Sequence, residues 1–222
     1  MPSAPRLLVV LAALAAHAAA PPATATGQVA SAPAQATGQG AAPTWSVSAS
    51  VYTYLLPDEG NYAQPTLAAD RDALHLEARY NYEALDTASA WAGYNFEGGQ
   101  AITWAITPML GGVFGDTTGI APGYKGSLGW WKLELYSEGE YVFDTGESSD
   151  SFFYNWSELS IAPVEWLRAG VVTQRTRAYR SDRDIQRGLL VGVTYRQLDV
   201  TAYVLNPDES TPTAVIALVL GF

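Results

Sequence analysis

The sequence contains no cysteine, so disulfide bonds contribute nothing to its stability. It has only two lysines, Lys125 and Lys132, and its 22 acidic residues outnumber its 12 Lys and Arg residues. The resulting formal net charge of −10 argues against nucleic acid as a partner, because phosphates bind basic surfaces. No apolar run approaches the roughly eighteen residues of a membrane-spanning helix. Stability must therefore come from a large core or from closure of a sheet.

The first twenty residues have the pattern of a secretory signal peptide. Arg6 supplies the positive charge, residues 7–16 are apolar, and residues 16–18 (Ala-His-Ala) form a small-x-small cleavage motif. We expect residues 1–20 to be removed during export. Residues 21–44 contain no charge and are rich in Ala, Pro, Thr, Gln and Gly, which predicts a disordered periplasmic arm. The alternative is that this arm plugs the domain that follows.

From Trp45 onward, apolar and polar side chains alternate, which is the period of a β-strand. The clearest segment places Leu74, Leu76, Ala78, Tyr80 and Tyr82 on one face and His75, Glu77, Arg79, Asn81 and Glu83 on the other. Twelve segments of this kind are found, at 45–56, 62–70, 73–83, 87–97, 100–114, 118–130, 132–143, 151–162, 166–178, 185–196, 199–206 and 212–222. Most of them are longer than the five or so residues usual in soluble sheets.

The connections between these segments alternate in character. Minimal connections are expected at 70–72, 97–99, 131–132, 163–165 and 197–198, and longer, mostly acidic ones at 57–61, 115–117, 144–150, 180–184 and 207–211. Short turns at one end and longer loops at the other are typical of outer-membrane barrels. The prediction is an all-β fold, a single antiparallel up-and-down transmembrane β-barrel of about twelve strands over residues 45–222. A secreted soluble β-sandwich is the alternative.

The last segment carries a resemblance to a known class of proteins. It is apolar on alternate residues and closes on phenylalanine, with Leu218, Leu220 and Phe222 on one face. It resembles the signal that outer-membrane barrels present to their insertion machinery, which implies that Phe222 faces lipid. Residues 107–119 and 132–141 are also similar to a functionally uncharacterised, porin-like family of bacterial outer-membrane proteins. That resemblance implies the barrel and the outer membrane, and no activity.

The polar faces of the strands supply the candidate functional residues. The residues expected to line the lumen are His75, Glu77, Arg79, Asn81, Lys132, Glu134, Tyr136, Glu138, Glu140, Glu158, Arg168 and Arg196. These charges predict either a constriction that selects ions or small solutes, or a salt-bridge network that seals a narrow barrel. Sequence alone leaves both open, because twelve strands lie between the filled barrels of eight and the open channels of sixteen.

An enzymatic reading depends on His75, the one histidine after the predicted cleavage site. Barrels that act on lipids would need a serine beside this histidine and an oriented Asn or acid, and no motif places a serine there. A pore-lining or structural histidine is therefore favoured over a catalytic one. With no cysteine and a single histidine, neither a zinc site nor a cofactor is expected.

Charges near the predicted loops have a separate interpretation. Strict alternation places Arg175 and Arg187 on the lipid side near the loop at 180–184, where they and Arg177 could pair with lipopolysaccharide phosphates; a β-bulge that turns them inward is the alternative. The acidic segment 144–150 lacks the spacing of a helix-loop-helix calcium site, so a solvated loop is expected.

The sequence thus predicts a small passive outer-membrane channel for ions or small polar solutes, without a cofactor. The alternatives are a sealed structural barrel of the envelope and, less favoured, a lipid-acting enzyme. The expected partners are membrane lipid, lipopolysaccharide and the insertion machinery, with no nucleic acid. The pattern does not fix an oligomeric state.

Overall fold

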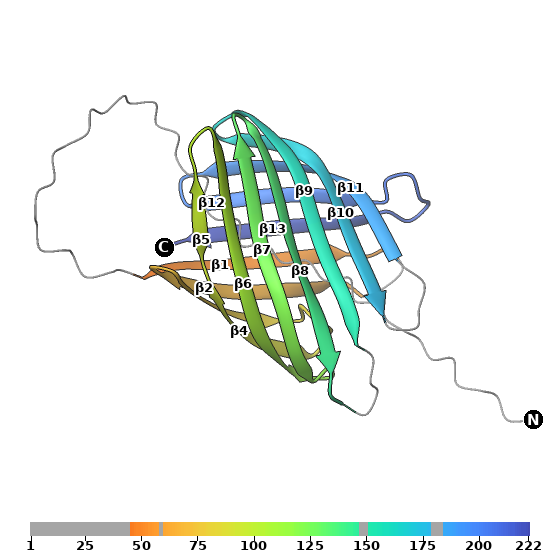
Figure 1. Ribbon diagram of the computed structural model, residues 1–222. Helices are drawn as coiled ribbons and strands as arrows, with labels where there is room; N and C mark the ends of the chain where they lie inside the picture. Colours follow the sequence, from red (N-terminus) through yellow and green to blue (C-terminus); the bar gives the residue numbers. More distant parts are fainter. Residues whose placement is uncertain (1–44, 58–59, 147–150, 179–183) are drawn as a thin grey trace, which may run out of the picture.

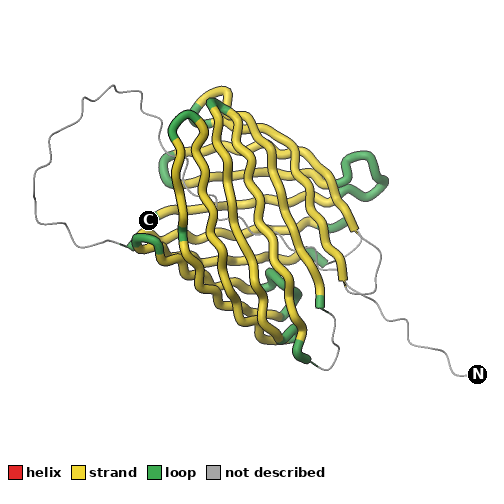
Figure 2. Tube along the Cα trace, in the orientation of Figure 1, coloured by secondary structure: helices red, strands yellow, loops and turns green. Residues whose placement is uncertain are grey.

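The computed structural model describes residues 45–57, 60–146, 151–178 and 184–222. The predicted signal peptide, the predicted arm at 21–44 and most of the predicted loops at 144–150 and 180–184 lie outside the described residues. Figure 2 shows that the described chain consists of strands joined by loops and turns. Within these ranges, no helix is long and apolar enough to cross a membrane.

Thirteen strands are described, and their bounds follow the predicted segments closely. They are β1 (Ser46–Leu55), β2 (Tyr62–Arg71), β3 (Leu74–Tyr80), β4 (Thr87–Tyr94), β5 (Phe96–Gly99), β6 (Ile102–Gly115), β7 (Gly119–Trp130), β8 (Leu133–Asp144), β9 (Phe152–Val164), β10 (Leu167–Ala178), β11 (Asp184–Tyr195), β12 (Leu198–Leu205) and β13 (Thr213–Gly221).

Antiparallel pairing between neighbours closes these strands into a barrel. β1 pairs with both β2 and β13, and β4 pairs with β6, so the sheet has no free edge along these strands. The near and far walls cross steeply, as tilted barrel strands do (Figure 1). The predicted all-β barrel of about twelve strands is confirmed: β5 is an extra short strand that follows β4 after Asn95 and continues its pairing with β6.

The strand connections define two ends of the barrel. Minimal turns follow β2, β5, β7, β9 and β11 at the end where β1 begins and β13 finishes, which we call the turn end. Asp72, Trp131 and Arg196 have positive φ angles of 52°, 55° and 56° in three of these turns. Positive φ at tight two-residue connections matches the right-handed twist of antiparallel hairpins. The longer connections lie at the opposite, loop end.

The two faces of the wall differ in chemistry. β3 alternates strictly between exposed and buried residues, with Leu74, Leu76 and Tyr80 exposed and His75, Glu77 and Arg79 buried. Large apolar side chains are exposed on every strand from β8 to β11 as well. A single closed sheet with apolar residues outside and polar residues inside is the pattern of a barrel in lipid, and it is the reverse of a soluble sandwich.

Candidate channel lumen

The guanidinium group of Arg79, on β3, is buried inside the barrel. Its Nε donates to Glu77 Oε1 at 2.9 Å, and its Nη1 donates to Glu140 Oε2 at 2.9 Å. Glu140 lies on β8, and three other strands separate β3 from β8 around the wall. The bond to Glu140 therefore crosses the lumen. The side chains of all three residues are no more than 3% exposed.

Two further residues join this cluster: Lys125, which was not predicted to line the lumen, and Glu83, which was predicted on the polar face of its segment. Lys125 on β7 donates to Glu77 Oε2 at 2.6 Å, and it is 7% exposed. Sequence reasoning missed Lys125 because Pro122 and several glycines obscure the alternation of its strand. Glu83 lies 3.8 Å from Arg79 Nη1 and accepts hydrogen bonds from Ser89 Oγ at 2.5 Å and Trp91 Nε1 at 3.2 Å.

The connection between β3 and β4, residues 81–86, turns into the lumen. The prediction of a strand reaching Glu83, with Tyr82 facing lipid, is wrong: β3 ends at Tyr80, and Asn81 has a positive φ of 56°. Tyr82 and Glu83 are each 1% exposed. The Tyr82 hydroxyl donates to Glu138 Oε1 on β8 at 2.9 Å, and its ring packs under Arg79, 4.0 Å from the guanidinium carbon. This segment, called the constriction loop below, narrows the barrel.

A second charged cluster lies nearer the turn end. Arg168 on β10 donates to Glu158 Oε2 at 3.3 Å, Asp199 Oδ1 at 3.1 Å and Thr201 Oγ1 at 2.6 Å. Glu158 also accepts a hydrogen bond from Trp156 Nε1 at 3.0 Å. Glu158 and Arg168 were both predicted to line the lumen, and the structure brings them together.

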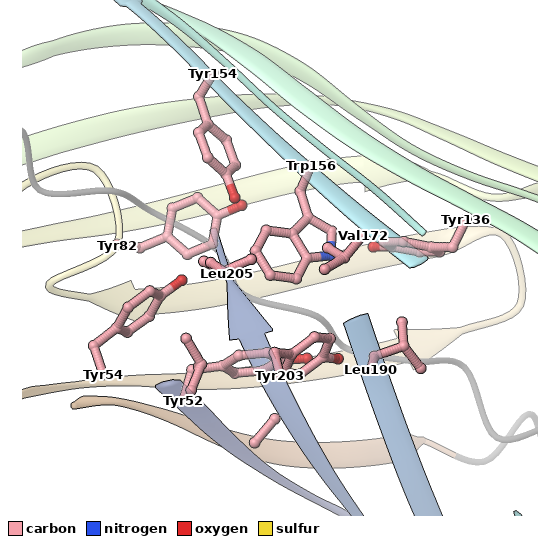
Figure 3. Close-up of a cluster of buried hydrophobic side chains, with 12 residues drawn as sticks. Tyr52, Tyr54, Tyr82, Tyr136, Tyr154, Trp156, Val172, Leu190, Tyr203 and Leu205 are labelled. Atoms are coloured by element: carbon pink, nitrogen blue, oxygen red, sulfur yellow. The ribbon is translucent and has the colours of Figure 1, made fainter. Parts of the chain in front are cut away.

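Aromatic side chains fill much of the remaining interior (Figure 3). The Tyr52 and Tyr203 rings stack with centroids 6.3 Å apart, and Trp156 meets Tyr203 edge-on at 5.3 Å. Tyr82 of the constriction loop meets Tyr154 edge-on at 5.9 Å. Stacked and edge-on contacts between residues of different strands brace the wall from within.

Three of the remaining predicted lumen residues lie on the inner face or in the constriction loop. Tyr136 is buried, and its hydroxyl donates to Glu138 Oε2 at 2.9 Å, whereas Glu134 lies on the same face at the exposed turn end. Asn81 is half-buried and anchors the constriction loop: its Nδ2 donates to the Ala63 carbonyl at 3.1 Å, and its Oδ1 accepts from the Asp86 amide at 2.9 Å.

Lys132 and Arg196 do not line the lumen, contrary to prediction. Both are exposed and lie in turn-end connections. Lys132 Nζ donates to the Pro163 carbonyl at 2.6 Å, and Arg196 lies over the ring of Tyr195 with 5.4 Å to its centroid. The prediction continued the alternation of the strands into two-residue turns, and it therefore placed these two side chains inside the barrel.

His75 is held by two carboxylates. Its Nδ1 lies 2.8 Å from Asp70 Oδ1, and its Nε2 lies 3.1 Å from Glu77 Oε2. Because both ring nitrogens meet acidic oxygens, neither is directed at a serine hydroxyl in this arrangement, as a Ser-His catalytic pair would require. Among the described residues, no group of three or more His, Asp or Glu side chains is arranged to hold a metal ion.

The outward arginines lie at the loop end. Arg175 lies beside Phe153, 5.7 Å from its ring centroid, and Arg187 donates to Asp208 Oδ2 at 2.7 Å. This ion pair lowers the pKa of the exposed Asp208 carboxyl, mainly through the hydrogen bond from Arg187. The side chain of Arg177 lies outside the described part of the chain. At the turn end, Leu218, Leu220 and Phe222 are all exposed, on the face expected for an insertion signal.

Comparison with solved structures places this arrangement in a known architecture. A KdgM porin superposes with a TM-score of 0.60 at 10% identity, over 79% of this chain and 99% of the porin. A KdgM porin in complex with disordered oligogalacturonate gives 0.59 at 9% identity over the same shares. The chain has a porin fold. No family model matches the sequence, and no curated protein matches it. At this identity the likeness establishes the porin barrel and leaves the solute to be argued from the lumen.

Proposed function

We propose that the chain is a passive outer-membrane channel that conducts small cations and uncharged polar solutes. The observation that carries the proposal is the excess of carboxylates inside the barrel. Among the described charged residues that are buried, the five glutamates are Glu77, Glu83, Glu138, Glu140 and Glu158, whereas the permanent cations are Arg79 and Lys125. A ring of net negative charge attracts cations and repels anions at a constriction.

The same excess of acid is unfavourable for the ligand named with one porin neighbour. One neighbour is described in complex with oligogalacturonate, a chain of sugar carboxylates. A polyanion would meet unfavourable charge beside Glu138 and Glu140, which are 2% and 4% exposed in the present barrel. We therefore propose that the porin fold is kept here and that the solute class differs.

Contacts across the lumen support a narrow channel. The Arg79–Glu140 and Lys125–Glu77 ion pairs and the Tyr82–Glu138 hydrogen bond each join segments on different parts of the wall. A path divided by such contacts admits ions and small solutes, and it excludes large ones. We further propose that the protein is exported with the help of its predicted signal peptide and resides in the outer membrane, with lipopolysaccharide as its lipid partner.

A sealed structural barrel is the second candidate, because Arg79, Lys125 and Arg168 are each paired with a carboxylate. Paired charges and close aromatic packing are what a barrel filled for stability would contain. The two candidates differ in one physical property, which is whether ions cross the folded barrel.

Single-channel recording of the refolded protein in a planar bilayer separates them. We expect discrete conductance steps, and larger steps from Tyr82→Ala, which removes the contact between the constriction loop and β8. Tyr195→Ala is the matched control, because Tyr195 is 68% exposed at the turn end of β11, away from the constriction loop. Silence from all three proteins, with folding confirmed by heat-modifiable gel mobility, would contradict the channel and support the sealed barrel.

A further inference from the structure

The lumen wall at the loop end contains buried hydrogen-bonding groups that have no partner within the described part of the chain. Gln174 on β10 is 2% exposed, and within the described residues neither its Nε2 nor its Oε1 has a hydrogen-bond partner. The Oε1 of Gln186 and the hydroxyl of Tyr154 are also without partners there. A buried amide without partners costs free energy of about 1–3 kcal/mol, so such groups usually serve a purpose.

These groups lie next to one another. Gln174 is directly opposite Gln186 on β11 and directly opposite Trp156 on β9. Side chains at directly opposed positions have Cβ atoms roughly 5 Å apart. Tyr154 is on the same face of β9 as Trp156, one alternation nearer the loop end. Two amides, a phenol and an indole thus share one part of the wall.

On β10 and β11, the inward side chains that the structure describes beside Gln174 carry no charge. The described inward residues of β9, β10 and β11 toward the loop end are Phe152, Tyr154, Trp156, Gln174 and Gln186, and the next pair nearer the turn end is Glu158 opposite Val172. Glu138 and Glu140 lie on β8 directly opposite Trp156 and Tyr154, where they are engaged by Tyr82 and Arg79. An anionic solute would therefore meet like charge beside these residues, which is unfavourable, whereas an uncharged solute would not.

We propose that Gln174 and Gln186, with the aromatic rings of Tyr154 and Trp156, form a binding site for an uncharged polyhydroxylated solute such as a simple sugar. An amide offers a donor and an acceptor, which a hydroxyl group matches with an acceptor and a donor. Aromatic rings pack against the apolar face of a sugar ring while the amides fix its orientation. The proposal rests on the proposed channel for the route by which the solute arrives.

The test measures binding separately from conduction. Ligand-observed saturation-transfer NMR on the refolded protein in detergent micelles would use D-glucose as the probe and D-glucuronate as its anionic counterpart. We expect transfer to glucose and little to glucuronate. Gln174→Met keeps the length of the side chain and removes the amide, and it should weaken glucose binding about tenfold, because two hydrogen bonds are lost.

Gln64→Met is the matched control. Gln64 is also buried inside the barrel, but its Nε2 already donates to the Asn81 carbonyl at 2.9 Å. Gln64→Met should leave glucose binding unchanged, even if it lowers the stability of the barrel. Because the amide of Gln174 has no partner among the described residues, the Gln174→Met barrel should unfold at the same urea concentration as the wild type or at a higher one.

Each outcome decides the proposal. Absence of transfer to glucose in the wild type, equal transfer to glucuronate, or unchanged transfer in Gln174→Met would overturn it and leave water as the partner of these groups. Glucose binding by a barrel that is silent in planar bilayers would overturn the channel and keep the site. Conduction without glucose binding would overturn the binding site and keep the channel.

Discussion

Replacing Arg79 by leucine should destabilise the barrel by about 3–5 kcal/mol, the cost of breaking a buried ion pair by removing one partner. The substitution removes hydrogen bonds of 2.9 Å to Glu77 and to Glu140. It also removes the contacts of the guanidinium with the rings of Tyr82 and Trp91, at 4.0 and 4.5 Å. The aromatic contacts add about 0.5–2 kcal/mol each when desolvated.

The carboxylates left behind differ in what still compensates them. Glu77 keeps Lys125 at 2.6 Å and His75 at 3.1 Å. Among the residues that the structure describes, Glu140 has no partner on its Oε1, and Arg79 donates to its Oε2. Most of the cost of Arg79→Leu should therefore arise at Glu140. Adding Glu140→Leu to Arg79→Leu should recover about 2 kcal/mol, because a leucine pair needs no charge compensation.

Urea unfolding in detergent micelles, followed by tryptophan fluorescence, measures both variants against the wild type, with the change in free energy taken from the midpoint and slope. Glu97→Leu is the control, because Glu97 is an exposed residue of β5. A single variant as stable as the wild type would refute the assignment of Arg79 as the centre of the lumen cluster. A double variant no more stable than the single one would refute the role given to Glu140.

Three further substitutions test other parts of the structure. Leu189→Arg places a charge on the outer face, where Leu189 is 57% exposed near the middle of β11. It should lower the free energy of unfolding in a lipid bilayer by about 2–4 kcal/mol, and unchanged stability after refolding into vesicles would contradict a membrane-spanning wall. Gly111→Ala should lower the free energy of unfolding by about 1–3 kcal/mol and alter tryptophan emission, because a Cβ there overlaps the ring of Trp91. An unaltered emission spectrum would show that the ring is placed wrongly. The pKa of the Asp208 carboxyl, measured by NMR, should lie below the usual aspartate range, so its ion pair with Arg187 persists above the unfolded-state pKa and is lost as pH falls through the folded-state pKa. Arg187→Gln should return the pKa of Asp208 to its ordinary value, and an unchanged pKa would exclude the pair.

The barrel was predictable because its signal is local and repeated. Alternation with period two and the contrast between short and long connections fixed nearly every strand to within a few residues, as with β8, expected at 132–143 and found at Leu133–Asp144. Errors arose where the backbone departs from alternation. Asn81 adopts a left-handed conformation that ends β3 and directs Tyr82 inward, and a strand pattern carries no sign of this change.

The residues that line the lumen were partly predictable from the sequence, but the contacts between them were not. Alternation shows that Glu77 and Glu140 lie on polar faces, yet only the closure of the sheet brings β3 and β8 to opposite sides of one cavity. Lys125 was missed because its strand is rich in glycine, so no apolar face is visible against which to place it. The unpartnered amide of Gln174 is likewise a property of packing and not of sequence.

The reversal potential of the open channel in a gradient of potassium chloride tests the central claim most directly. An acidic lumen predicts that K⁺ permeates in preference to Cl⁻, and that Glu138→Gln, which removes a carboxylate 2% exposed inside the barrel, reduces that preference. A preference for chloride, or one unaffected by Glu138→Gln, would contradict a cation channel governed by the buried glutamates.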